Sequence, residues 1–121
     1  MKRIERIDSS SHAFDIFPDL SIRARESRPG PPKRIEGMTV GFVRMTEDAP
    51  HGGEVHPDGD EVLCVIEGRL RVVGDSSPKD AIELAPGEAC IIPKGEWHTV
   101  QVLKPAMFVH ITPGPNGDHR P

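Results

Sequence analysis

Turn-forming residues recur at short intervals through most of this 121-residue chain, and they limit the length of any element that it can form. The 12 glycines and 13 prolines together exceed average usage, which predicts about 15 in a chain of this length. From Ile35 onward they separate short apolar segments, and no segment of ten or more residues keeps a helical period without a breaker. Short strands joined by turns are therefore expected, as in an all-β sandwich or barrel.

The expected strands are short apolar or alternating segments, each bounded by turn chemistry. They are Thr39–Met45, Gly53–His56, Glu61–Glu67, Arg69–Val73, Ala81–Leu84, Ala89–Ile92, Trp97–Leu103 and Ala106–Thr112. The length of the chain suits one domain.

Charge and composition divide the chain into three parts. Residues 1–36 carry 8 basic and 6 acidic side chains, whereas residues 37–121 carry 7 basic and 13 acidic side chains. We expect an N-terminal lead-in over 1–36, a barrel over 37–113 and a surface tail over 114–121. In the lead-in, the apolar residues of 14–20 predict one short docked strand, and Ile22–Arg34 predicts an extended or mobile connection. Alternatively, the lead-in is a basic arm that meets a second subunit.

Composition also argues against several classes of function. A net charge of −4, with no Tyr and one Trp, does not suit a nucleic-acid-binding surface. The apolar runs have strand length, so no transmembrane helix and no membrane partner are expected. Cys64 and Cys90 form no CxxC pair, and the charged start lacks the apolar run of a signal peptide. These features predict a cytoplasmic protein in which both cysteines are reduced and pack as small hydrophobic side chains.

Ionisable residues gather at the ends of three expected strands. Glu54 and His56 share one strand face, because alternate residues of a strand point to the same side. Glu61 begins the returning strand after a Pro-Asp-Gly-Asp turn, and His98 begins another strand after a second turn. Two imidazoles and one or two carboxylates that converge inside a barrel suit a divalent metal ion.

The same residues resemble the two sequence motifs of the cupin family. The first cupin motif has a His-x-His pair, then a Glu after three or four residues and a Gly after six more. Here Glu54-Val55-His56, Glu61 and Gly68 stand at those places. The second motif has a Gly, five residues, Pro-x-Gly, two residues and a His. Here these places hold Gly87, Pro93-Lys94-Gly95 and His98.

The resemblance implies a double-stranded β-helix, or jelly-roll, with a metal ion in its mouth. By position, the ligands would be His56, Glu61 and His98, with Glu54 where the first His of the family normally stands. A carboxylate at that place favours Mn, Fe(II) or Zn, and Ni and Co also suit such ligands. Glu54 could instead be a catalytic general base.

Two further histidines lie near the motifs. His51, in the turn before Glu54, could replace the missing His, although a histidine in a turn is more often solvated. His110 alternates with Val109 and Ile111, so it faces away from them and is expected to line the pocket or the surface rather than bind metal.

The cupin resemblance implies a site but does not specify a substrate. We expect a metal-dependent enzyme of dioxygenase type that acts on a small oxygen-bearing organic acid, enol or phenol. The alternatives are a cupin isomerase or lyase, and a non-catalytic cupin that binds a small molecule as a sensor or carrier. An anionic substrate could meet Arg44, Arg69 or Arg71, although outward-facing arginines are more common. The resemblance also implies a homodimer, formed through barrel faces or exchanged N-terminal strands.

Overall fold

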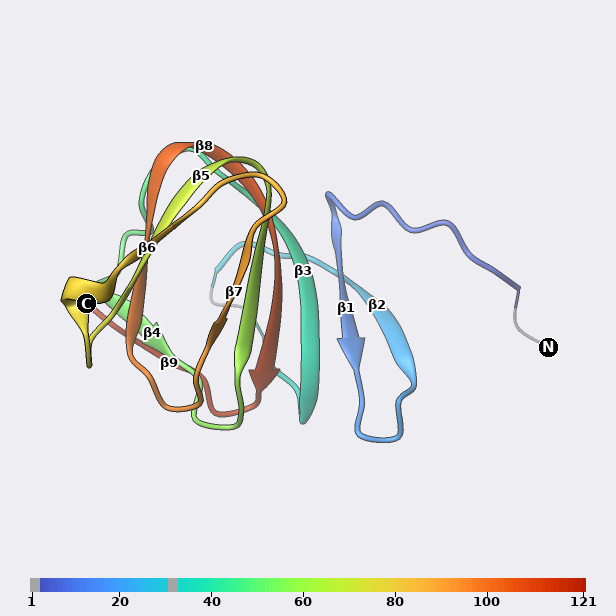
Figure 1. The fold of residues 1–121 in the computed structure, drawn as a ribbon. Helices are drawn as coiled ribbons and strands as arrows, with labels where there is room; N and C mark the ends of the chain where they lie inside the picture. The colour runs from blue at the N-terminus through green and yellow to red at the C-terminus, as the bar shows by residue number, and fades with distance from the viewer. Residues whose placement is uncertain (1–2, 31–32) are drawn as a thin grey trace.

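The structure is a computed structural model that describes residues 3–30 and 33–121. In these ranges it contains nine strands, one 3-10 turn (η1, Pro78–Asp80) and no α-helix (Figure 1). The strands are β1 His12–Ile16, β2 Ile22–Glu26, β3 Gly37–Met45, β4 Gly53–Val55, β5 Glu61–Gly74, β6 Ile82–Leu84, β7 Ala89–Ile92, β8 His98–Gly114 and β9 Asp118–Arg120. The predicted all-β fold is confirmed. No helix among the described residues is long and apolar enough to cross a membrane.

Strands β5 and β8 each replace two of the expected strands. They pair antiparallel over most of their length, with register shifts between Val65 and Leu70. Gly68 and Pro105 lie opposite each other at this bend, where a Cβ at position 68 would overlap the carbonyl oxygen of Pro105. The breakers therefore bend a continuous strand pair instead of ending it, because the lost pairing is confined to a bulge.

Strand β8 organises the sheet. Its C-terminal half pairs with β3 and β5, and His98 at its start pairs with Glu54 of β4. The order through the sheet is β2-β1-β3-β8-β4-β9, while β6 and β7 pair with β5. Pairing with both β4 and β5 brings the ends of three strands that carry ionisable residues to one place.

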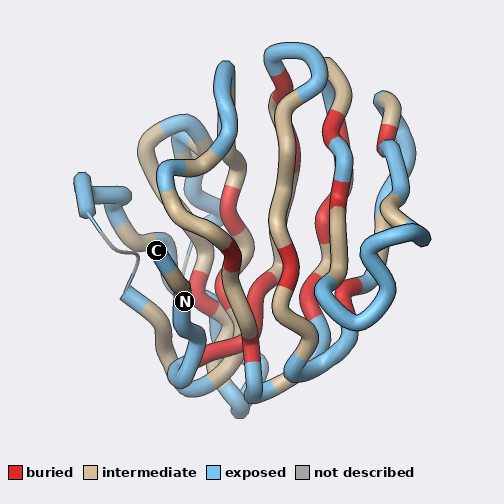
Figure 2. The backbone as a smooth tube through the Cα atoms, turned by 90° about the vertical axis from the view of Figure 1, so that its left-hand side faces the viewer, coloured by how far each residue is buried: buried red, intermediate tan, exposed pale blue. Residues whose placement is uncertain are grey.

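The core lies on the inner faces of β5, β6, β7 and β8, and the buried positions recur along these strands (Figure 2). Its buried apolar residues are Leu63, Val65, Leu70, Val72, Leu84, Ile92, Ala106 and Phe108. Alternate residues of a strand point to the same side. The inner face of β5 therefore includes Val65, Leu63 and Glu61, and the inner face of β8 includes Phe108, His110 and Thr112. The inner face therefore changes from apolar to polar toward one end of the barrel.

The N-terminal segment forms a hairpin beside the barrel (Figure 1). Strand β1 pairs with β2 and with β3, and buried Asp15 accepts hydrogen bonds from Nε of Arg25 at 2.8 Å and Oγ1 of Thr39 at 2.9 Å. The prediction of a connection over Ile22–Arg34 was wrong for Ile22–Glu26, which is strand β2. Residues 31–32 of that prediction lie outside the described residues.

The C-terminal segment forms strand β9, which pairs with β4. Arg120 anchors β9 through a bidentate ion pair with Asp75, with N–O distances of 2.6 and 2.7 Å. The guanidinium of Arg120 also lies over the ring of Trp97. Because β4 is only three residues long, this pairing supports the strand that carries Glu54.

Candidate metal centre

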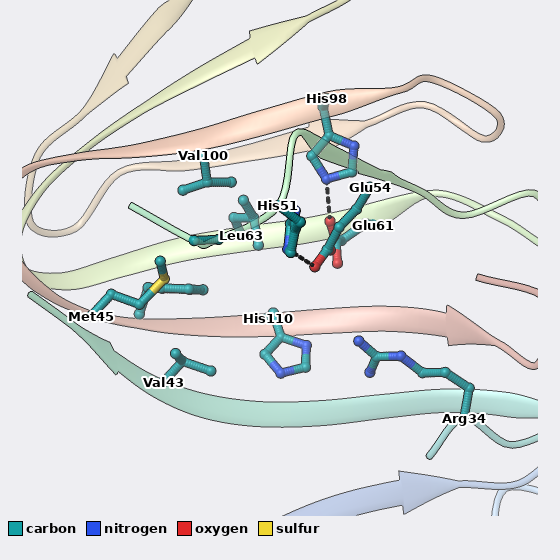
Figure 3. A pocket seen from close by; sticks show the side chains of 12 residues that line it. Arg34, Val43, Met45, His51, Glu54, Glu61, Leu63, His98, Val100 and His110 are labelled. Atoms are coloured by element: carbon teal, nitrogen blue, oxygen red, sulfur yellow. Dashed lines mark ion pairs between the residues drawn. The ribbon is translucent and has the colours of Figure 1, made fainter. Parts of the chain in front are cut away.

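Four predicted site residues lie together at the polar end of the barrel, and Figure 3 shows three of them, Glu54, Glu61 and His98. One ligand atom from each of Glu54, His56 and His98 lies within 4.8 Å of the other two, so these three side chains could hold a metal ion. Glu61 contacts both imidazoles: its Oε2 is 3.3 Å from Nε2 of His56, and its Oε1 is 3.2 Å from Nε2 of His98.

The four side chains differ in their access to solvent. His56, Glu61 and His98 are only 5%, 4% and 3% exposed, whereas the side chain of Glu54 is 37% exposed. The two histidines and Glu61 therefore form the base of the site, and Glu54 lies on its open side.

His56 carries the clearest indication of a missing partner. Both of its ring nitrogens are buried and have no hydrogen-bond partner among the described residues. The carboxylates of Glu54 and Glu61 lie 3.6 and 3.3 Å from Nε2, yet neither contact has hydrogen-bond geometry. Buried polar atoms nearly always have a hydrogen-bond partner or bind a metal ion. A metal ion bound by Nε2 would therefore suit this side chain.

The backbone orients His98. Its Nδ1 lies 3.1 Å from the carbonyl oxygen of Glu96, which can only accept, so Nδ1 carries the proton and donates it. In the neutral ring, Nε2 then presents its lone pair toward Glu61. A hydrogen bond from the other ring nitrogen is the usual way in which proteins orient a metal-binding imidazole.

A chain of hydrogen bonds orients Glu61. The hydroxyl of Thr112 donates to Oε2 of Glu61 at 2.6 Å, and Oγ1 of Thr112 accepts from Nδ1 of His110 at 2.7 Å. Thr112 is fully buried. The ring of His110 lies over Gly41, where a Cβ would overlap its Nε2.

His51 binds the outer oxygen of Glu54. Its Nδ1 accepts from the backbone N–H of Gly53 at 3.3 Å, so the proton of a neutral ring is on Nε2, which lies 3.1 Å from Oε1 of Glu54. His51 therefore supports Glu54 and is not part of the group that could hold a metal ion.

The cluster is strongly coupled electrostatically. Burial lowers the pKa of His56, but contacts with Glu54 and Glu61 outweigh it and raise that pKa to about 9. Burial raises the pKa of Glu61, yet the contacts with His56, His98 and Thr112 hold it well below its usual range. The contact with His56 lowers the pKa of Glu54. The carboxylates thus stay ionised at neutral pH, as ligands or bases must be.

A cavity of about 260 Å³ opens beside the cluster. Its polar wall includes Glu54, Glu61, His98, His110 and Arg34. The apolar wall consists of Val43, Met45, Ala49, Leu63, Val100 and Phe108. The volume lies below the roughly 300–1,000 Å³ of drug-sized ligand sites, so it suits a small molecule.

The sequence missed three residues of the site: Arg34, His110 as a partner of Thr112, and Thr112 itself. None belongs to a spacing motif. The pairing of β5 with β8 brings Thr112 and His110 beside Glu61, and Arg34 lies where the chain passes Gly114. The strand arginines proposed for an anion lie elsewhere. Arg44 and Arg69 pair with Glu67 and Glu83, and Arg71 is exposed.

The two cysteines lie outside the group that could hold a metal ion. Both are free and half-buried, and Cys90 packs against the core. Burial raises the pKa of the Cys90 thiol, which keeps it protonated and suits a packing role.

Comparisons with known proteins agree with the fold and the motifs. The family described as "Cupin domain" matches residues 41–112, and no curated protein matches the chain. A cupin-2 domain containing protein from Shewanella frigidimarina has a TM-score of 0.55 and 24% identity over 74% of this chain and 85% of its own. A protein from Neisseria meningitidis has a TM-score of 0.56 and 21% identity over 74% and 89%. An oxalate oxidase in complex with the substrate analogue glycolate has a TM-score of 0.54 and 21% identity over 67% and 45%.

The chain belongs to the cupin domain family. Its fold is the jelly-roll that the two motifs predicted, with an open sheet and an added N-terminal hairpin.

Proposed function

We propose that this cupin is a metal-dependent enzyme of dioxygenase type that acts on a small oxygen-bearing organic molecule. The proposal rests on His56, because neither of its buried ring nitrogens has a hydrogen-bond partner in the part of the chain that the structure describes, while two carboxylates and a second imidazole surround it. His56, His98 and Glu54 would hold the ion, with Glu61 as a further ligand or as the carboxylate that fixes both imidazoles.

A divalent ion at this place would polarise a substrate oxygen as a Lewis acid and, if redox-active, would support chemistry with O₂. Glu54 is ionised and half-exposed beside the cavity, so it can accept a proton from a substrate hydroxyl or enol. His51 holds the other oxygen of Glu54 and thereby fixes the direction in which that proton moves. The apolar wall limits the water that can enter with the substrate.

The first test is metal analysis of protein purified without chelators or a His tag. We expect one divalent ion per chain, with the ion lost in His98→Ala and retained in His12→Ala, a histidine of the N-terminal hairpin. Protein reconstituted anaerobically with Fe(II) or Mn is then given O₂ and a panel of catechols, enols and β-diketones. Substrate-dependent O₂ uptake supports the enzyme.

Other outcomes separate the alternatives. Metal binding with tight ligand binding but no turnover favours a non-catalytic sensor or carrier, and conversion without O₂ uptake favours an isomerase or lyase. Glu54→Gln resolves the role of that carboxylate, because lost turnover with full metal content indicates a base and lost metal indicates a ligand. A chain that binds no divalent ion contradicts the proposal.

A further inference from the structure

Arg34 lines the cavity beside the metal centre but takes part in none of the ion pairs or hydrogen bonds found among residues 3–30 and 33–121. Four other arginines pair with carboxylates at 2.6–3.4 Å. They are Arg25, Arg44, Arg69 and Arg120. Burial lowers the pKa of Arg34, although a guanidinium stays charged in proteins. Among the described residues no carboxylate lies within ion-pair distance of Arg34, and Glu54 and Glu61 act on it only from farther away, so a ligand anion could supply a direct counter-ion.

The backbone fixes the position of Arg34. Gly114, at the end of β8, pairs with Gly37 at the start of β3. A Cβ at position 114 would lie 2.6 Å from the carbonyl oxygen of Ile35 and 2.8 Å from Cβ of Arg34. The chain that carries Arg34 therefore lies directly against β8, and its side chain extends from this anchored point into the cavity (Figure 3).

The cavity is polar at one end and apolar at the other (Figure 3). Arg34 enters from one side, next to His110, and the opposite side is closed by Val43, Met45 and Val100. Glu54, Glu61 and His98 lie between these ends, on the facing wall. A ligand that fills the cavity would thus meet a cation, then the metal centre, then apolar side chains.

The charges of the site indicate the charge of that ligand. With neutral imidazoles, the carboxylates of Glu54 and Glu61 balance a divalent ion, and Arg34 then leaves one net positive charge. Burial and the nearby Arg34 guanidinium lower the pKa of His110, so His110 adds no further charge at neutral pH. One net positive charge in the site complements a monoanion.

We propose that this pocket binds a small organic acid whose carboxylate pairs with the Arg34 guanidinium and whose adjacent oxygen faces Glu54, His56 and His98. The apolar remainder of the acid packs against Val43, Met45 and Val100. Guanidinium and carboxylate can form two parallel hydrogen bonds, so Arg34 selects a planar acid over a neutral analogue. This inference rests on the proposed metal centre for the direction of the adjacent oxygen, and on Arg34 alone for the carboxylate.

The experiment measures binding and not turnover. Calorimetry compares 2-hydroxyhexanoate with its neutral isostere 2-hydroxyhexanamide, on metal-free and zinc-loaded protein, for wild type, Arg34→Gln and Arg34→Lys. Arg44→Gln is the control, because Arg44 is an exposed arginine paired with Glu67. We expect the acid to bind wild type more tightly than the amide. Arg34→Gln should lower the affinity for the acid by about tenfold or more, as expected for the loss of a hydrogen bond between charged groups. The affinity for the amide should not change.

Arg34→Lys should recover part of the affinity, and Arg44→Gln should behave as wild type. Thermal unfolding checks the fold, and Arg34→Gln should be no less stable than wild type because it removes a half-buried charge without a partner. Equal affinity for acid and amide, no binding of the acid, or an acid affinity that Arg34→Gln leaves unchanged would overturn the inference. The inference would also be overturned if pentyl phosphate, which is a dianion, bound more tightly than the acid.

Zinc content is measured on the same samples, so the two proposals can fail separately. Bound zinc without an Arg34-dependent preference for the acid leaves the metal centre standing and overturns the carboxylate site. An Arg34-dependent preference for the acid in a chain that binds no metal leaves the carboxylate site standing and overturns the metal centre.

Discussion

At the scale of single residues, the site is a set of imidazoles and carboxylates that hold one another in charged form when no metal is bound. His56 interacts with Glu54 and Glu61, and His98 interacts with Glu61. Burial lowers the pKa of His98, but the contacts with Glu61 and the Glu96 carbonyl outweigh it, so that pKa is raised. Protonation, metal binding and stability are therefore linked through the same few atoms.

The stability of the metal-free protein should fall as the pH rises from about 6.5 to about 9. The folded state raises the pKa of His56 from 6.5 to about 9, so its stabilising contribution is complete below 6.5 and is lost as His56 deprotonates. Glu61 acts in the opposite direction, because its lowered pKa contributes stability above 4.5 that is lost on acidification. Thermal unfolding of chelator-treated protein across this range measures the effect.

Glu61→Gln is the matched variant for that measurement. It removes one of the two carboxylates that raise the pKa of His56, so the fall in stability between pH 6.5 and 9 should become shallower. A wild-type profile that is flat above pH 6.5 would contradict the coupling.

Metal binding should release protons at pH 7. An imidazole must be neutral to bind a metal ion, and His56 is protonated in the metal-free site below about pH 9. Affinity for Zn²⁺ should therefore rise with pH toward 9, and calorimetry in buffers of different ionisation enthalpy should detect about one released proton or more. Binding that is independent of pH between 7 and 9 is incompatible with the assignment of His56 as a ligand.

The residues of the cluster could be predicted because they sit at fixed spacings on strands. Glu54, His56, Glu61 and His98 follow motif positions. Strand alternation left a pocket or a surface position open for His110, and the structure places it in the pocket lining. Arg34 could not be predicted, because it lies in a basic connection with no periodicity. Its place in the cavity depends on how closely residues 34–35 approach Gly114.

At the scale of elements, close approaches between neighbouring strands position the side chains of the site. The start of β8 lies beside β4, and its C-terminal half lies between β3 and β5. The sequence placed the segments of β5 and β8 correctly but divided each into two, since Gly68 and Pro105 read as strand ends and not as a bend. Strand β2 was missed because its alternating charged residues resemble a solvated linker until β1 pairs with it.

Gly41→Ala should destabilise the protein by roughly 1–3 kcal/mol, because the new Cβ would overlap the ring of His110. The displaced ring would also lose its hydrogen bond to Thr112. Combining Gly41→Ala with His110→Ala should remove most of the steric cost, so the two effects should not add. Denaturant unfolding measures the double-mutant cycle.

Gly59→Ala is the control for this cycle, because a Cβ there would meet only the side chain of Pro113, at 3.3 Å or more. A Gly41→Ala protein as stable as wild type would show that β3 and β8 are not held in this register.

At the scale of the whole molecule, the N-terminal hairpin is the part most suited to contact a second chain. It projects beside the barrel, and β2 ends the sheet order (Figure 1). Leu20, at the tip of this hairpin, and Ile22, at the start of β2, are 81% and 57% exposed. Residues 14–16 already have β2 and β3 as partners in the same chain, so exchange between chains is not needed to pair them.

A homodimer remains our prediction for the assembly, and the structure adds the open edge of β2 as the place where the two chains would pair. Light scattering at micromolar concentration should give twice the chain mass of 13.3 kDa. Removal of residues 1–26 should then give a monomer, and a monodisperse wild-type monomer would contradict the prediction.

An anomalous difference map of zinc-loaded crystals, recorded at the zinc edge, would locate the metal ion in the barrel. We predict a single strong peak about 2 Å from Nε2 of His56, Nε2 of His98 and a carboxylate oxygen of Glu54. The distance from that peak to Glu61 will show whether this carboxylate binds the ion or only positions the two imidazoles. A peak away from His56 and His98, or no peak in this part of the barrel, would contradict the account.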